Sequence, residues 1–190
     1  FGCRDGEMTK HLVAGDPLYI TDNYQEFLDN TMNQFDEQYR HRIRSYLIHD
    51  FAVNSTNTVQ IDFSMLPQEQ FGFVFSFNYF NYRSIQGFKD YLTEIFKLLR
   101  PGGVMMFTYN NADLGQAAAY AENYFMSYMP KSLLIPLVSS LGYDVEYGGG
   151  IRISDFSLDD VDDWTKFSSR FMPYETSLIS WGVKCSVSMT

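Results

Sequence analysis

Two glycines near the start of the chain, and an acid at the end of the next apolar run, have the types and spacing to bind a nucleotide. Gly2 and Gly6 bracket a short loop that leads into a helical pattern, and Asp22 ends the stretch PLYITD. Glycine permits a positive φ or a close backbone approach to a ligand, because it has no Cβ. A carboxylate accepts hydrogen bonds from both hydroxyls of a ribose. This order is typical of nucleotide recognition in α/β folds, and a plain structural turn has the same glycine spacing.

The elements that would position these residues alternate between strand and helix patterns. We expect strands at 18–22, 58–61, 71–77, 104–109, 145–147 and 178–187. We expect helices at 7–14, at 24–47 with a break near 30–33, and at 85–99, 133–141 and 157–171. Ser84 is the expected N-cap of the helix at 85–99. This alternation predicts an α/β fold with a doubly wound, mostly parallel sheet and helices on both faces.

Polar and aromatic residues follow several of the expected strands. In a parallel sheet the carboxyl ends of the strands share one edge, and ligands bind there. Beside Asp22, the residues at these ends are Asp62, Phe63, Phe77, Asn78, Tyr79, Tyr109 and Asn110. An acid, an acid next to a ring and two polar–aromatic clusters could together hold a ribose, an adenine and a further polar group.

Five segments, in their order, resemble the class I S-adenosylmethionine-dependent methyltransferases of the Rossmann-like superfamily. They are FGCRDGEMT, YITDNYQEFL, VQIDFSMLP, FGFVFSFNYF and EIFKLLRPGGVMMFTY, and LLRPGG before a strand is the most distinctive piece. The later segments LGYDVEYGG and LISWGVKC resemble the closing pair of strands of that family, of which the last is antiparallel. The resemblance implies one methyltransferase-like domain over residues 1–190, with S-adenosyl-L-methionine as cofactor.

The resemblance also implies roles for individual residues. The glycine loop would lie beside the methionine end of the cofactor, and Asp22 would bind the ribose hydroxyls. Asp62 would lie near the adenine amino group, Phe63 would pack on the adenine ring, and Phe77 would lie near the sulfonium. The implied cofactor-binding residues are Gly2, Cys3, Gly6, Asp22, Asn23, Asp62, Phe63 and Phe77.

Two features depart from the family pattern. Arg4 stands where the loop usually has its middle glycine. The sequence begins at Phe1, directly at the loop, so we expect the N-terminal strand that feeds the loop to belong to a longer chain. These departures leave an alternative open, in which the chain is a methyltransferase-fold module that has lost catalysis and has a structural or protein-interaction role. An NAD(P)-dependent oxidoreductase fits the Pro-Gly-Gly strand and the closing strands poorly.

On the substrate side we expect Tyr79, Asn110, Tyr120 and Tyr124, with residues 112–132 forming an insertion or lid. The four-residue spacing of Tyr120, Tyr124 and Tyr128 predicts one helical face, packed on the core or used as that lid. The resemblance implies methyl transfer to a small molecule or a protein side chain. A sulfonium already activates its methyl group, so the protein must mainly align the acceptor and exclude water. The sequence indicates no catalytic base.

The charge and composition of the chain limit the kinds of partner that it could bind. The net charge of −9 argues against nucleic acid as a partner, and the Asp/Asn/Ser-Pro-Pro-aromatic motif of amino-directed DNA methyltransferases is absent. The two cysteines and three histidines have no metal-ligand spacing, and the aspartates at 155–163 lack the EF-hand pattern. Aromatics at 17% suggest a protein partner or an oligomer through an aromatic surface. The basic cluster at 40–44 is either a solvated helix face or a docking patch. We expect a cytoplasmic protein without a membrane span.

Overall fold

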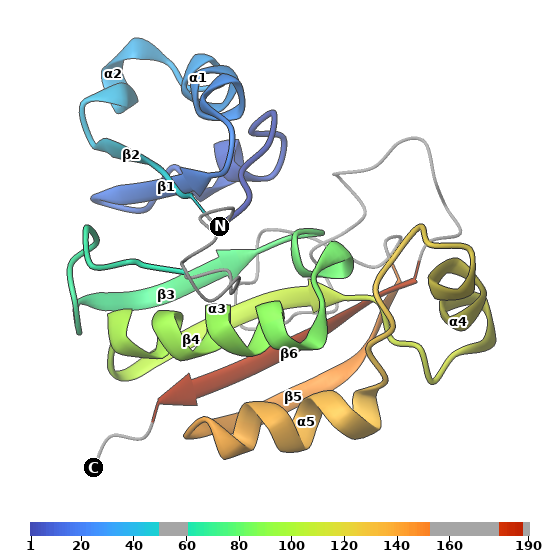
Figure 1. The fold of residues 1–190 in the computed structure, drawn as a ribbon. Helices are drawn as coiled ribbons and strands as arrows, with labels where there is room; N and C mark the ends of the chain where they lie inside the picture. Colours follow the sequence, from blue (N-terminus) through green and yellow to red (C-terminus); the bar gives the residue numbers. More distant parts are fainter. Residues whose placement is uncertain (50–60, 153–178, 188–190) are drawn as a thin grey trace, which may run out of the picture. The chain divides into compact units, whose positions relative to one another are not determined.

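A computed structural model describes residues 1–49, 61–152 and 179–187. The chain divides into two compact units, each with its own sheet (Figure 1). Unit 1 comprises Phe1–Ile48 and Ile151–Ile179, and unit 2 comprises His49–Gly150 and Ser180–Thr190. The single domain expected over 1–190 stays a prediction.

Unit 1 is built on two parallel strands, β1 (Leu18–Asp22) and β2 (Ile43–Leu47). Their register runs from Leu18 opposite Ile43 to Asp22 opposite Leu47. A short 3-10 helix, η1 (Thr9–Leu12), precedes β1, and the helices α1 (Gln25–Asn33) and α2 (Glu37–Arg40) connect the two strands. The apolar core between them consists of Ile20, Leu28, Phe35 and Ile43.

The helix expected to run as far as Leu47 is wrong in its last part, because residues 43–47 form β2. A spacing of four residues between Ile43 and Leu47 suits one face of a helix, and it also places both side chains on one face of a strand. The strand is formed because β1 is buried at Ile20 and Thr21, so its backbone groups need a hydrogen-bonding neighbour. Of the strand expected at 58–61, residues 58–60 lie outside the described part, and Ile61 belongs to no strand.

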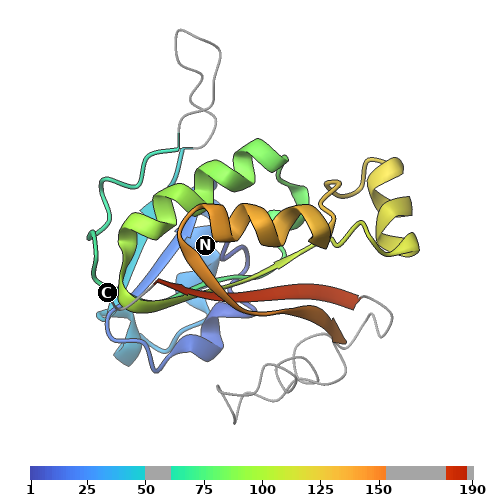
Figure 2. The ribbon, with the colours of Figure 1, turned by 90° about the horizontal axis from the view of Figure 1, so that it is seen from below.

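Unit 2 contains a four-stranded sheet in the order β3-β4-β6-β5. Its strands are β3 (Phe71–Ser76), β4 (Leu99–Tyr109), β5 (Tyr143–Arg152) and β6 (Ile179–Val187). β3 and β4 are parallel, and β6 runs antiparallel to β4, which confirms the predicted antiparallel last strand. The helices α3 (Ile85–Leu98) and α5 (Lys131–Ser140) cover the same face of this sheet (Figure 2).

The first part of β4, directly after α3, shows why Pro-Gly-Gly stands there. The helix begins at the predicted cap, where Ser84 Oγ accepts a hydrogen bond from Gly87 N. After the helix, Gly102 has a φ of 73°, which favours glycine. A Cβ on Gly103 would lie only 2.7 Å from the carbonyl oxygen of Phe71 on the neighbouring strand. The two glycines therefore let β4 start directly against β3.

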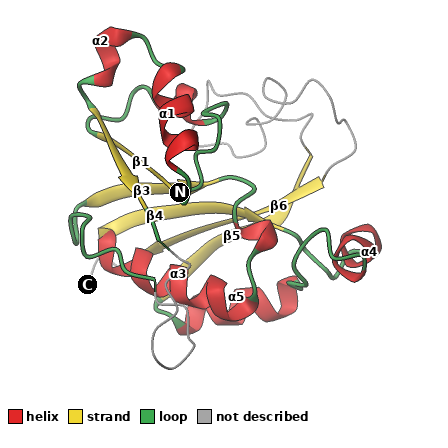
Figure 3. Cartoon of the chain, turned by 45° about the horizontal axis from the view of Figure 1, so that its top comes forward, coloured by secondary structure: helices red, strands yellow, loops and turns green. Residues whose placement is uncertain are grey.

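Between β4 and α5 the chain makes an excursion, residues 112–130, that carries the helix α4 (Gly115–Glu122) away from α3 and α5 (Figure 3). The excursion is closed at its base, where Ala112 N donates to the carbonyl of Met129 over 3.2 Å. The prediction that Tyr120, Tyr124 and Tyr128 share one helical face is wrong. The helix ends at Glu122, Tyr124 has a φ of 61° and 96% of its surface exposed, and Tyr128 is 61% exposed. α4 has no buried residue, so no apolar packing extends it to these tyrosines.

Candidate functional site

The glycine loop of unit 1 is tied to the end of β1. The backbone N–H groups of Gly2 and Cys3 donate to the carbonyl oxygen of Thr21 over 2.9 and 3.3 Å. Gly2 and Gly6 have φ values of 68° and 79°, and Gly6 N closes the loop with a 2.9 Å bond to the Cys3 carbonyl. Both glycines thus occupy the left-handed region that the sequence predicts for them.

Gly6 also brings the loop against helix α1. A Cβ at this position would lie 2.8 Å from the backbone Cα of Thr31, closer than a real Cβ contact allows. The side chain of Thr31 then reaches the loop, because its Oγ1 donates to the carbonyl of Arg4 over 2.8 Å. Thr31 is fully buried, so this bond is shielded from water.

Asp22 accepts three backbone hydrogen bonds. Its Oδ2 accepts from Arg4 N at 2.9 Å, and its Oδ1 accepts from Asn23 N at 2.7 Å and from Tyr24 N at 3.3 Å. A carboxylate has about four acceptor positions, and these bonds use three of them. Asn23 is itself fixed by a 3.1 Å bond from its Nδ2 to the carbonyl of Ile48.

Cys3 has no reactive character in this loop. Burial raises the pKa of its thiol to about 11, and a hydrogen bond with Thr31 opposes the shift only in part. The thiol is therefore neutral at physiological pH and packs beside the apolar core of unit 1. Unit 1 thus brings together all five of its predicted cofactor residues, which are Gly2, Cys3, Gly6, Asp22 and Asn23.

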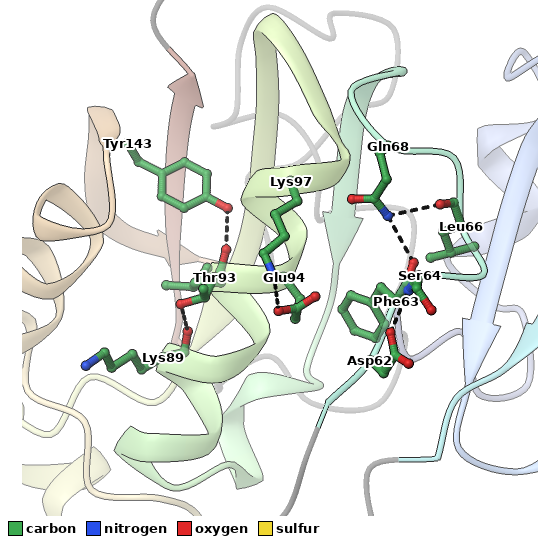
Figure 4. A network of polar contacts seen from close by, with 11 residues as sticks. Asp62, Phe63, Ser64, Leu66, Gln68, Lys89, Thr93, Glu94, Lys97 and Tyr143 are labelled. Atoms are coloured by element: carbon green, nitrogen blue, oxygen red, sulfur yellow. Dashed lines mark hydrogen bonds and ion pairs between the residues drawn. The ribbon is translucent and has the colours of Figure 1, made fainter.

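In unit 2, Asp62 lies at the surface. Its Oδ1 accepts a 2.8 Å hydrogen bond from Ser64 N, and bonds from Ser64 hold the pKa of the carboxyl below its usual value. Gln68 fixes the following turn by donating to the carbonyls of Phe63 and Leu66 over 3.2 and 3.1 Å (Figure 4). Asp62 is therefore an ionised, accessible acceptor on an ordered turn.

Phe63, in contrast, belongs to the core. Its ring is 0% exposed and packs against Tyr91 with 5.5 Å between the ring centroids. The packing of Phe63 on an adenine stays a prediction, and in this structure its ring has no exposed face. Its partner Tyr91, on α3, is itself only 1% exposed.

Phe77 ends a row of stacked rings that starts on β3. Phe73 and Phe75 stack at 6.2 Å, and Phe75 and Phe77 stack at 6.5 Å between centroids. Alternate residues of a strand point to the same face, so the ring of Phe77 extends the aromatic face of β3. Phe77 is half-buried and keeps part of its surface accessible.

Tyr79 points inward rather than toward the solvent. Its hydroxyl lies 2.5 Å from the hydroxyl of Tyr91, and the Arg83 guanidinium lies over its ring at 4.4 Å from the centroid. The rings of Tyr79 and Tyr91 also make an edge contact. These contacts give Tyr79 a place in the packing of η2 (Phe80–Tyr82) and α3.

Asn110 supports the excursion instead of facing an open site. Its Nδ2 donates to the carbonyls of Ala117 and Ser127 over 3.0 and 3.1 Å, and only 7% of the residue is exposed. Tyr120 lies on α4, and Tyr124 follows it on the exposed side of the excursion. The structure therefore does not bring Tyr79, Asn110, Tyr120 and Tyr124 together through their polar groups.

The sequence analysis did not identify Thr31 as a residue of the site. Thr31 follows Leu28 by three residues in α1, and both are buried. Its signal in the sequence is a hydroxyl at a core-facing helical position, which requires a buried hydrogen-bond partner. The sequence alone does not indicate that this partner is the carbonyl of Arg4.

The remaining clusters are structural in the part of the chain that the structure describes. Arg40, Arg42 and Arg44 each donate to a backbone carbonyl, which favours a structural face over a docking patch. No group of three or more potential metal ligands occurs among the described residues. No helix within these residues is long and apolar enough to cross a membrane. The aspartates of 155–163 and the helix expected at 157–171 lie outside them.

Comparison with known proteins gives a family match over the N-terminal half. Residues 1–107 match the family model described as the methyltransferase domain. No curated protein sequence matches the chain.

Solved structures of low sequence identity share the fold. An S-adenosylmethionine-dependent methyltransferase from Mesorhizobium loti is 11% identical, with 97% of this chain and 88% of that chain covered and a TM-score of 0.62. A chain from the complex of the Haloferax volcanii Trm112 methyltransferase activator with a putative methyltransferase is 15% identical, with 96% and 89% covered and a TM-score of 0.60. The [4+2]-cyclase SpnF is 12% identical, with 100% and 74% covered and a TM-score of 0.64.

Proposed function

The chain belongs to the methyltransferase-domain family, whose cofactor is S-adenosyl-L-methionine, and from this premise we propose that it is an enzyme that transfers the cofactor's methyl group to a small molecule or a protein side chain. The observation that carries the proposal is the joining of the glycine loop to Asp22 in unit 1. Asp62 is proposed as a second acceptor, for the amino group of the adenine. Nucleic acid remains an improbable acceptor because the net charge is −9.

The residues of unit 1 fit such a cofactor. Gly2 and Gly6 give the loop its positive φ values, and the missing Cβ of Gly6 lets the loop pack directly against α1. The carboxylate of Asp22 is proposed to accept a hydrogen bond from a ribose hydroxyl. When bound, the cofactor supplies a methyl group on a sulfonium that needs no further activation. The chain's own residues then have to align the acceptor and keep water out.

Titration calorimetry with S-adenosyl-L-methionine tests the proposal. We expect heat of binding with the wild-type chain and a strongly reduced affinity for Asp22→Asn, because the neutral amide binds both the loop and a ribose less well. Asp36→Asn is the matched control, since Asp36 is exposed and makes no cap bond. Folded wild-type protein that binds no cofactor would contradict the proposal.

The second candidate, a module without catalysis, rests on the aromatic residues at the tip of the excursion. Tyr124 and Phe125 are 96% and 68% exposed, which is unusual for aromatic side chains. The Haloferax volcanii complex contains a methyltransferase activator, and a protein partner at this tip is the corresponding proposal here. A chain that binds the cofactor and methylates no acceptor in any partner's presence would favour this candidate.

Cys3 and Cys185 form no disulfide, and we propose the cytoplasm as the compartment.

A further inference from the structure

We propose that Thr31 is a positioning residue for the cofactor, because it holds the glycine loop in its binding conformation at Arg4, the residue other than glycine that has a positive φ in this loop. The inference rests on the proposed function, since it concerns the affinity for S-adenosyl-L-methionine. It concerns a residue on α1 that lies well beyond the loop in the sequence and that the loop pattern does not include.

The need for such a residue comes from Arg4. Arg4 has a φ of 46°, in the left-handed region that is unfavourable for any residue with a Cβ. A strained backbone of this kind persists only when its surroundings hold it in place. Gly2 and Gly6 on either side have positive φ values without that strain. Arg4 is thus the point at which the loop would relax to another shape.

Two side chains hold the backbone of Arg4, one on each of its polar groups. Asp22 Oδ2 accepts from Arg4 N over 2.9 Å, and Thr31 Oγ1 donates to Arg4 O over 2.8 Å. Asp22 is 4% exposed and Thr31 is 0% exposed, so water competes little for either bond. The N–H and the carbonyl of one strained residue are therefore both fixed from outside the loop.

Thr31 also sets the distance between the loop and α1. Its Cα lies 2.8 Å from where a Cβ of Gly6 would be, and its hydroxyl hydrogen-bonds with the thiol of Cys3. The same residue thus contacts the loop at Cys3, Arg4 and Gly6. Thr31 supplies, through hydrogen bonding, the conformational control that a glycine at position 4 would have by itself.

The closing experiment is a double-mutant cycle read by calorimetric titration with S-adenosyl-L-methionine. Thr31→Val keeps the shape and removes the hydroxyl, and we expect about five- to tenfold weaker binding, the effect of one buried hydrogen bond. Thr31→Ser keeps the hydroxyl and should bind within about twofold of the wild type. In an Arg4→Gly background, Thr31→Val should cost less than about twofold, because glycine reaches a positive φ unaided.

The outcomes separate this inference from the proposed function. Wild-type protein that binds no S-adenosyl-L-methionine contradicts the proposed function. Wild-type binding with equal affinity in Thr31→Val, or with equal losses in both backgrounds, overturns only the role of Thr31, because a purely structural role does not depend on residue 4. If Thr31→Val does not fold, Arg4→Gly alone decides: binding at least as tight as the wild type supports the inference. A loss of threefold or more overturns it, since the Arg4 side chain would then be the contact.

Discussion

The predicted site residues, for the cofactor and for the substrate, converge in unit 1 and diverge in unit 2. In unit 1, Asp22 joins the glycine loop to β1 and α1 through three backbone hydrogen bonds. In unit 2, Asp62 is exposed, Phe63 is in the core, and Tyr79 turns toward Tyr91. The acids in the two units match the same family pattern, yet Asp22 is buried in the framework and Asp62 is an exposed group bonded only within its own turn.

The difference lies in what the side chains meet. The groups around Asp22 belong to the backbone, and their positions follow from the chain's spacing and from the glycines. The groups around Tyr79 and Phe63 are rings on α3, such as Tyr91, and rings pack according to the shape of the whole core. Backbone sites are therefore predicted well by sequence motifs, whereas the direction of a ring at a strand end is not.

Filling the loop of unit 1 should have the largest effect. Gly6→Ala places a Cβ against the backbone of α1 at a φ of 79°, and we expect a loss of about 3 kcal/mol in the free energy of unfolding from strain and overpacking. Denaturant unfolding measures it. Gly115→Ala is the control, because a Cβ at Gly115 meets nothing within 4 Å. Equal stability of the two variants would show that the loop does not pack on α1.

The next largest difference is expected between Asp22→Asn in unit 1 and Asp62→Asn in unit 2, measured as the change in the free energy of unfolding. Asp22→Asn should lower the free energy of unfolding by about 2 kcal/mol, since it weakens charge-assisted bonds to a buried carboxylate. Asp62→Asn should leave it nearly unchanged, as expected for a surface substitution. Thermal unfolding of the two variants side by side is the measurement. A larger loss at Asp62 than at Asp22 would reverse the comparison.

Because the Tyr79 hydroxyl contacts Tyr91, we expect its removal to lower the stability of the fold and to leave cofactor binding unchanged. Tyr79→Phe leaves the Tyr91 hydroxyl without this partner, and we expect a loss of about 1–2 kcal/mol in the free energy of unfolding. The affinity for S-adenosyl-L-methionine should stay unchanged. Tyr82→Phe, at a 58% exposed position, is the control and should have no measurable effect. If Tyr79→Phe weakened cofactor binding and Tyr82→Phe did not, Tyr79 would belong to the binding site after all.

The smallest effect is a pH dependence of unit 1. Because the pKa of Cys3 is raised to about 11 in the folded chain, the unfolded thiol ionises first. The stabilisation is therefore complete below about pH 9 and is lost as the pH rises toward 11, by about 1 kcal/mol at pH 10. Stability curves of the wild type and Cys3→Ala between pH 7 and pH 10 measure it. Parallel curves would mean that the thiol is not buried as described.

Much of the fold could be predicted from local patterns. The cap at Ser84 and the glycines in the first part of β4 fix α3 and β4, because each acts within a few residues of its own position. The family resemblance added the antiparallel β6. β2 could not be predicted, since Ile43 and Leu47 suit a helix equally well and only pairing with β1 decides.

The site could be predicted where its residues stand close in sequence. Gly2, Gly6 and Asp22 stand close in sequence, and the structure joins them. Thr31 could not be assigned, because its bond to Arg4 spans 27 positions of sequence and depends on how α1 packs. For the same reason the packing of Asn110 against the excursion could not be read from the strand pattern alone.

The closed base of the excursion has a consequence for cutting the chain. Tyr124 and Phe125 form an exposed tip that suits chymotrypsin, a protease that cuts after aromatic residues. The side chain of Asn110 donates hydrogen bonds to the backbone on both sides of that tip, at Ala117 and at Ser127. A nick at the tip should therefore leave two fragments that stay associated.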